Sequence, residues 1–265
     1  MLSSQSVYVG VDTTSAHKAF TYAVLDRDLN VLSVSEAELD EVLAFLAAQP
    51  AATVAINAPS HLNTGLVRKS LRAEIQAKRG AGRRQSASQQ LRGVELRLAE
   101  HELRERGILV GGTASRDSLC PPWVQIGLEL YRKLGKLDFQ PYPTEDCPRQ
   151  WLETHPHAAY CALLGRLPFS KPSLEGRLQR ELVLFEHGLR IRDPLLFFEE
   201  ITRHKLLAGV LPMELLYPTE HVDALVAAYT AWVSVNKPAE ATRLGSAAEG
   251  YVYLPGRELK EKYQA

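Results

Sequence analysis

The first sixty residues alternate between apolar and polar positions in a pattern that predicts short strands joined by tight turns. Val7, Val9 and Val11 share one face of residues 7–12, and this run ends on Asp12. Residues 18–25 form a second predicted strand, residues 26–30 a polar turn, and residues 31–34 a short third strand. The pattern therefore predicts an antiparallel three-strand meander at the start of the chain.

A helix and a buried strand are predicted next. Ser35 can cap a helix that begins at Glu36, and apolar residues follow at helical spacing through residues 39–46. Residues 52–57 are almost continuously apolar, which is typical of a central strand covered on both faces. Because a helix connects this strand to the meander, we expect it to run parallel to a neighbour.

The remainder of the chain is mostly helical in pattern. Helices are predicted at residues 88–106, from Pro121 onward, and at residues 175–187, 194–207 and 219–235. Short strands are predicted at residues 108–110, 151–154 and 250–254, and a loop at residues 238–248. One α/β domain spanning residues 1–265, with a basic and helical insertion at residues 60–148, accounts for this order.

Composition and charge restrict the partners. The 265 residues include 31 basic and 31 acidic side chains, so no overall field attracts nucleic acid or a membrane, and any polyanion site must be local. The three cysteines form no C-x-x-C pair, which favours a reducing compartment. With no signal-peptide pattern and no apolar run of about 20 residues, we expect a cytoplasmic protein without a membrane partner. The pattern leaves the oligomeric state open.

Several polar side chains fall at predicted strand ends or at the start of a helix: Asp12, Asn57, Glu153 and Asp223. Ligands of open α/β sheets gather at the carboxyl edge of the strands, so these groups can converge there. Converging carboxylates repel unless a cation lies between them, and Mg²⁺ or Mn²⁺ with oxygen ligands suits phosphodiester hydrolysis. Each residue also has a purely structural interpretation, such as an Asx-turn at Asp12 or a favourable helix-dipole position for Asp223.

Six short motifs occur in series: VGVDTT at 9–14, VAINAP at 54–59, RLAEHELRERGI at 97–108, WLETHP at 151–156, VDALVAA at 222–228 and EGYVYLP at 249–255. Their order and spacing resemble the family known as domain of unknown function 429, predicted RNase-H-like nucleases. The resemblance implies an RNase-H-like mixed sheet flanked by helices, with an acidic, metal-binding site at Asp12, the end of the fourth strand, Glu153 and Asp223. Asn57 stands where the family usually has aspartate, so it can contact a metal or its water but brings no charge.

The insertion contains the candidate substrate contacts. Residues 68–84 hold seven basic side chains and one acid, enough to neutralise several phosphates, and we expect Arg79, Arg83 and Arg84 to bind the nucleic-acid backbone. A solvated charged loop is the alternative. The resemblance also directs Arg97 at a scissile phosphate, although its spacing to Glu100 equally fits a helix-supporting pair. His155, before Pro156, is more typical of a helix cap than of a metal ligand.

Three functions follow from these observations. The first is a Mg²⁺- or Mn²⁺-dependent nuclease with Asp12, Glu153 and Asp223 as catalytic metal ligands, acting on a nucleic acid whose type the sequence leaves open. The second is a phosphotransferase of the actin and sugar-kinase type, which the first loop resembles but for which a second phosphate loop and a glycine-rich adenosine loop are lacking in the sequence. The third is a catalytically impaired protein that binds a polyanion or a partner.

Overall fold

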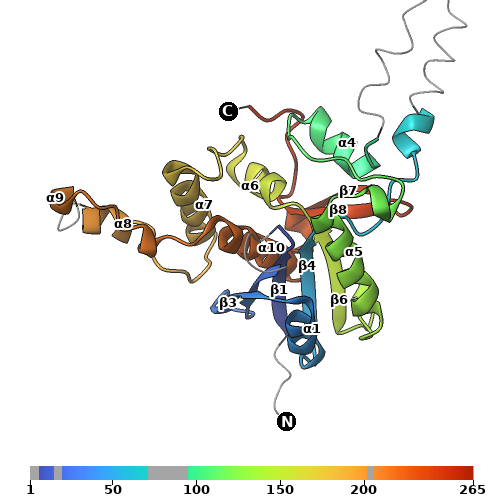
Figure 1. Cartoon of the computed structure of the whole chain (residues 1–265), viewed down its shortest axis with the longest axis horizontal. Helices are drawn as coiled ribbons and strands as arrows, with labels where there is room; N and C mark the ends of the chain where they lie inside the picture. The colour runs from blue at the N-terminus through green and yellow to red at the C-terminus, as the bar shows by residue number, and fades with distance from the viewer. Residues whose placement is uncertain (1–5, 15–19, 71–94, 202–205, 265) are drawn as a thin grey trace, which may run out of the picture.

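The protein is a mixed α/β structure, seen here in a computed structural model that describes residues 6–14, 20–70, 95–201 and 206–264 (Figure 1). Its eight described strands are β1 (Val7–Asp12), β2 (Phe20–Leu25), β3 (Val31–Ala37), β4 (Ala52–Asn57), β5 (Gln140–Pro141), β6 (Arg149–Thr154), β7 (Ala241–Ser246) and β8 (Gly250–Pro255). The α-helices are α1 (Leu39–Ala47), α4 (Leu98–Glu105), α5 (Pro122–Gly135), α6 (Pro156–Leu164), α7 (Leu174–Glu186), α8 (Leu196–Glu200), α9 (Leu206–Ala208) and α10 (Thr219–Asn236). Short 3₁₀ turns lie at η1 (Asp117–Leu119), η3 (Met213–Leu215) and η4 (Pro238–Glu240).

The strands form one sheet in the order β3-β2-β1-β4-β6-β8-β7, with β5 paired to β6. The predicted meander is confirmed, since β1, β2 and β3 pair antiparallel. The predicted parallel pairing of β4 is also confirmed, because β4 runs parallel to both β1 and β6. This mixed sheet with flanking helices is the RNase-H-like α/β arrangement that the motifs implied.

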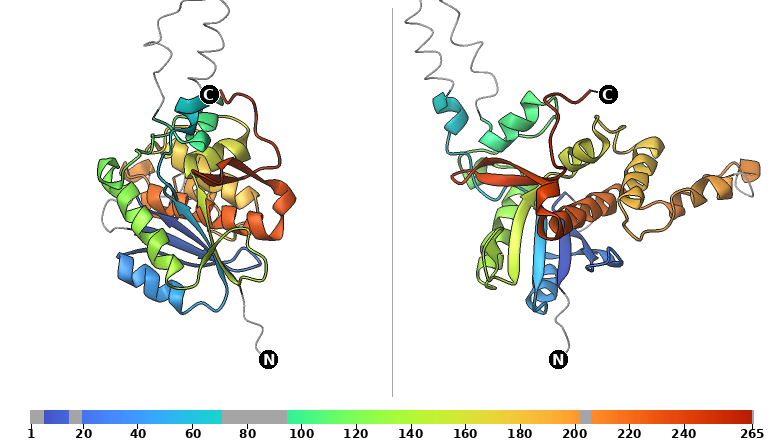
Figure 2. Two further views of the ribbon diagram at one scale, coloured as in Figure 1. Left: turned by 90° about the vertical axis from the view of Figure 1, so that its right-hand side faces the viewer. Right: turned by 180° about the vertical axis from the view of Figure 1, so that it is seen from behind.

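Helices cover both faces of the sheet, so the strands are buried between two hydrophobic layers. On one face, α10 lies across β1, β2 and β4 (Figures 1 and 2). The approach is close: a Cβ atom at Gly10 would lie 2.0 Å from the backbone oxygen of Ala224 in α10. On the other face, α1 and α5 pack on β1 and β4 through residues such as Leu46 and Leu130. Because Gly10 has no side chain, the acidic end of β1 lies directly beside α10.

Several boundaries differ from the predicted ones. Helix α1 begins at Leu39 rather than Glu36, because Glu36 extends β3 and pairs with Thr21 of β2. Residues 108–110 form no strand, and the loop predicted at 238–248 contains β7, which pairs antiparallel with β8. Helix α6 was not predicted. Parts of the predictions at 18–25, 88–106 and 194–207 lie outside the described residues.

The helices of the described ranges are all too short or too polar to cross a bilayer.

Candidate active site

Asp12 ends β1, and its side chain is fully buried. Its Oδ1 accepts a 2.7 Å hydrogen bond from Nδ2 of Asn57 and a 3.2 Å bond from the backbone N–H of Thr14. The Thr14 hydroxyl lies 2.9 Å from both carboxylate oxygens. Burial raises the pKa of Asp12, and the hydrogen bond from Asn57, the charge of Lys171 and the bonds from Thr14 oppose that rise. Asp12 and Thr14 therefore form the Asx-turn that the sequence allows. Its hydrogen bonds hold the Asp12 carboxylate in place but offset the effect of burial on its pKa only in part.

Asn57 ends β4 and is the direct partner of Asp12 in the parallel register of β1 and β4. Its backbone oxygen accepts a 2.9 Å hydrogen bond from the hydroxyl of Thr13. Because its side-chain amide donates to Asp12, it stabilises the charge that an aspartate at this position would repel.

Asp223 lies one turn into α10 and is also buried. Its Oδ2 lies 2.5 Å from Nζ of Lys171, in the loop between α6 and α7. Burial raises the pKa of Asp223 to about 6; Lys171 opposes the rise, and the negative charge of Asp12 adds to it. The two aspartates therefore interact electrostatically, and Lys171 is a third charged member of this group that sequence reasoning missed.

Glu153 does not join this group. Glu153 pairs with Ile56, which in turn pairs with Val11, so its side chain and that of Asp12 project to opposite faces of the sheet. Nη1 of Arg97 donates to Oε2 of Glu153 at 3.0 Å, and Nη2 of Arg97 donates to Oε1. Ser60 adds bonds to Oε2 from its backbone N–H at 2.7 Å and its hydroxyl at 2.9 Å. The expectation that Glu153 meets the two aspartates must be corrected: its carboxylate is neutralised elsewhere.

Arg97 is buried beside Glu153 and makes several hydrogen bonds. Its side chain is only 2% exposed, and its Nε donates to Oε1 of Glu100 at 2.8 Å. Its Nη1 donates a further 2.9 Å bond to the backbone oxygen of Glu249. Although burial disfavours the charged form, Glu153 and Glu100 together raise the pKa of Arg97. These bonds tie the start of α4 to β6 and to the residue before β8, and contact of Arg97 with a substrate phosphate stays a prediction.

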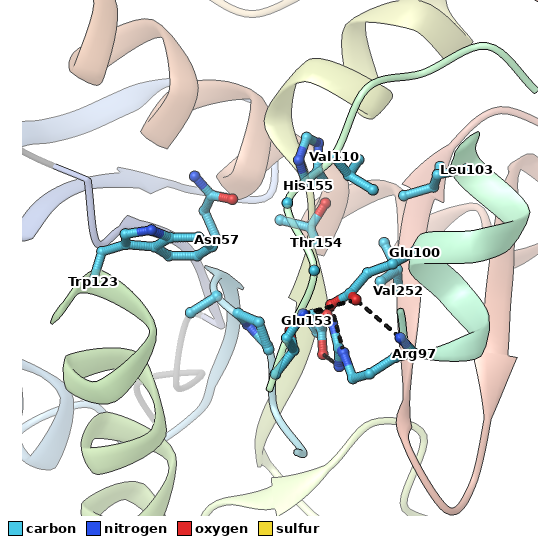
Figure 3. A pocket seen from close by; sticks show the side chains of 15 residues that line it. Asn57, Arg97, Glu100, Leu103, Val110, Trp123, Glu153, Thr154, His155 and Val252 are labelled. Atoms are coloured by element: carbon cyan, nitrogen blue, oxygen red, sulfur yellow. Dashed lines mark hydrogen bonds and ion pairs between the residues drawn. The ribbon is translucent and has the colours of Figure 1, made fainter. Parts of the chain in front are cut away.

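A small hollow that is open to solvent lies beside Glu153 and Arg97, which line it (Figure 3). Asn57 and His155 line it together with Trp123, while Glu153 turns toward Arg97. His155 caps α6, as predicted, because its Nδ1 accepts a 3.2 Å hydrogen bond from the backbone N–H of Ala158. Burial, followed by the charge of His157, lowers the pKa of His155 to about 4. The ring is therefore neutral near pH 7, with its proton on Nε2.

These side chains suit one cation rather than two. Within the described part of the chain, no three His, Cys, Asp or Glu side chains are grouped so that they could hold a metal ion. Mg²⁺ is nevertheless commonly held by only one or two carboxylates, with water and substrate completing its shell. Asp12 and Asp223 supply two carboxylates, and the Asn57 amide lies beside them. These oxygen donors fit a single divalent cation once the Lys171 ammonium has moved away from Asp223.

The predicted phosphate-binding segment is described only at its start. Residues 66–70 are helical, and the Arg68 side chain is half-exposed, with Nη2 3.8 Å from Oε1 of Glu95. Arg79, Arg83 and Arg84 lie outside the described residues. Their contact with nucleic acid therefore stays a prediction.

A comparison with known protein families shows to which family the chain belongs. The model of the family described as "Protein of unknown function (DUF429)" matches residues 10–243, which is most of the chain. The chain belongs to the DUF429 family. Neither the curated proteins nor the solved structures contain a significant match. The matched region includes both aspartates, Asn57 and Lys171, so the described site lies wholly within the part shared with this family.

Proposed function

We propose that this DUF429 protein hydrolyses phosphodiester bonds in nucleic acid, using one Mg²⁺ or Mn²⁺ ion held by Asp12 and Asp223. The observation that carries the proposal is the burial of two interacting carboxylates, Asp12 at the carboxyl end of β1 and Asp223 in α10. Burying like charges together costs free energy, and an apolar pair would pack there more cheaply. Perturbed acids of this kind concentrate at functional sites.

The described side chains have distinct tasks in this proposal. A bound divalent cation lowers the pKa of water and stabilises charge on phosphate oxygens. Asn57 and Thr14 hold the Asp12 carboxylate in one orientation. His155 lines the adjoining hollow, and because its Nδ1 is engaged by α6, its Nε2 presents an N–H donor suited to an anionic oxygen. Glu153 supports the fold beneath the site and takes no part in the chemistry.

The basic segment supports nucleic acid as the substrate class. Residues 68–84 carry seven basic side chains and one acidic one along the sequence, in a chain of zero net charge. Phosphate neutralisation by such side chains makes binding fall steeply with salt concentration. Neutralising Arg79, Arg83 and Arg84 together should flatten the slope of log affinity against log salt by about one unit per lost contact. An unchanged slope would remove this segment from the interface.

A binding protein without hydrolytic activity is the second candidate. Two observations favour it: an amide replaces the acid expected at Asn57, and the third predicted acid, Glu153, is neutralised by Arg97. Such a protein would bind nucleic acid without cleaving it.

Cleavage assays separate the two functions. Single- and double-stranded DNA and RNA are incubated with the full chain in Mg²⁺, in Mn²⁺ and in EDTA. The nuclease proposal predicts metal-dependent cleavage that Asp12→Asn and Asp223→Asn each reduce at least 100-fold. Asp40→Asn removes an exposed acid from α1 and should leave the rate unchanged. Binding without cleavage in every metal would support the binding protein instead.

A further inference from the structure

Lys171 forms an ion pair with the buried Asp223. Its Nζ is 2.5 Å from Oδ2 of Asp223, and its charge also acts on Asp12 and Glu220. Both aspartates are buried, whereas the Lys171 side chain remains 37% exposed. The site thus already contains one positive charge, on a side chain that is partly exposed to solvent.

The loop that carries Lys171 is anchored firmly on α7. Ser173 caps this helix by accepting a 3.0 Å bond from the backbone N–H of Gly176, and its hydroxyl donates to the backbone oxygen of Ser170 at 2.9 Å. A Cβ atom at Gly176 would lie 1.9 Å from that same Ser170 oxygen, so the turn packs directly on the helix backbone. The buried Arg180 donates a 3.0 Å bond to the backbone oxygen of Phe169. The backbone on both sides of Lys171 is therefore held in place, and the Lys171 side chain reaches from this fixed turn to Asp223.

We propose that Lys171 is a built-in counter-ion that occupies the cation place between Asp12 and Asp223, and that a divalent cation binds only by displacing its ammonium. This inference rests on the proposed function, because it concerns the same site. The two carboxylates and the ammonium leave one uncompensated negative charge, whereas a divalent cation would neutralise both carboxylates. An ammonium that stayed in place would repel the incoming cation.

Displacement predicts that removal of the ammonium strengthens metal binding. Mn²⁺ is titrated calorimetrically into the full chain and into Lys171→Met at pH 8, well above the pKa of about 6 that burial gives Asp223. We expect Lys171→Met to bind Mn²⁺ at least tenfold more tightly, and Lys171→Arg to resemble the unaltered chain. Lys133→Met is the matched control, since it removes an exposed ammonium that pairs with Asp40 and Glu129 on the surface.

The outcomes separate this inference from the proposed function. Equal Mn²⁺ affinity in Lys171→Met and the unaltered chain, abolished by Asp12→Asn, overturns the counter-ion role while the metal site stands. Weaker binding in Lys171→Met overturns it as well. No Mn²⁺ binding in either protein overturns both the counter-ion role and the metal-dependent function.

A second measurement needs no substitution. Lysine acylation at limiting reagent is followed by mass spectrometry of the full chain with and without Mn²⁺. Displacement predicts that Mn²⁺ speeds the modification of Lys171 at least threefold, because its ammonium leaves the ion pair, while Lys133 reacts at the same rate. An unchanged or slower rate at Lys171 contradicts displacement.

Discussion

Asp12 and Asn57 stand side by side in the parallel register of β1 and β4, and the Asn57 amide donates a 2.7 Å hydrogen bond to the Asp12 carboxylate. An aspartate at position 57 would repel the Asp12 carboxylate, whereas the Asn57 amide stabilises its negative charge. It also permits the site to remain folded with Lys171 as its cation, because only two carboxylates need compensation.

Restoring the acid at position 57 should make the fold depend on metal. In Asn57→Asp, two carboxylates would face each other where a donor now meets an acceptor. We expect a loss of about 2 kcal/mol or more in the free energy of unfolding at pH 8 without metal. Added Mn²⁺ should recover more stability in this variant than in the unaltered chain. Urea unfolding with and without Mn²⁺ measures both effects, and a variant as stable as the parent in EDTA would contradict the account.

The pH dependence of stability should report the burial of Asp223. Its pKa in the folded protein, about 6, lies above the ordinary value of 3.8, so the folded state binds this proton more tightly than the unfolded state. The stabilising contribution is complete below about pH 4 and is lost as the pH rises through about 6. Relative to Asp223→Asn, the unaltered chain should lose about 2 kcal/mol between pH 4 and pH 7. Parallel stability curves for the two proteins would show that the carboxyl is not perturbed.

Glu153 should matter for stability but not for metal binding. Its partner Arg97 is buried, and removing one member of a buried ion pair typically costs about 3–5 kcal/mol. Arg97→Met should lose stability in this range, because it leaves both Glu153 and Glu100 without their cation. Glu153→Gln should bind Mn²⁺ with unchanged affinity in calorimetry. A folded Glu153→Gln protein that no longer binds Mn²⁺ would return Glu153 to the metal site.

The contact between β1 and α10 should tolerate no side chain at residue 10. A Cβ atom there would lie 2.0 Å from the Ala224 oxygen and 2.2 Å from the Ala228 nitrogen. Gly10→Ala must therefore push α10 away from β1 and separate Asp12 from Asp223. We expect a loss of about 3 kcal/mol or more, at the severe end of overpacking effects. Thermal unfolding measures it, and a Tm equal to that of the parent would contradict the packing described here.

The sequence predicts the sheet better than it predicts the site. Strand β1 shows alternating valines and β4 is a nearly continuous apolar run, and both observed strands match the predicted residues. The pairing of Asp12 with Asn57 follows because both residues end neighbouring parallel strands. Strand β7 was missed because its residues are mostly half-buried and include Gly245, so its pattern resembles a loop.

The two errors at the site have physical causes. Glu153 lies one residue before the end of β6, in register with Ile56 rather than with Asn57, and a difference of one residue moves a side chain to the other face of a sheet. Lys171 lies in a loop without periodicity, and its proximity to Asp223 arises only from the packing of α6 and α7 beside α10. Long-range contacts of this kind leave no local signal in the sequence.

The central claim is that Asp12 and Asp223 form one cation site, which the Lys171 ammonium occupies when no metal ion is bound. Anomalous diffraction from a crystal soaked in Mn²⁺ at pH 8 tests it directly. We predict one peak between these two carboxylates, with the Lys171 ammonium moved away from Asp223. A peak at Glu153, or no peak near Asp12 with the Lys171 ion pair intact, would contradict the claim.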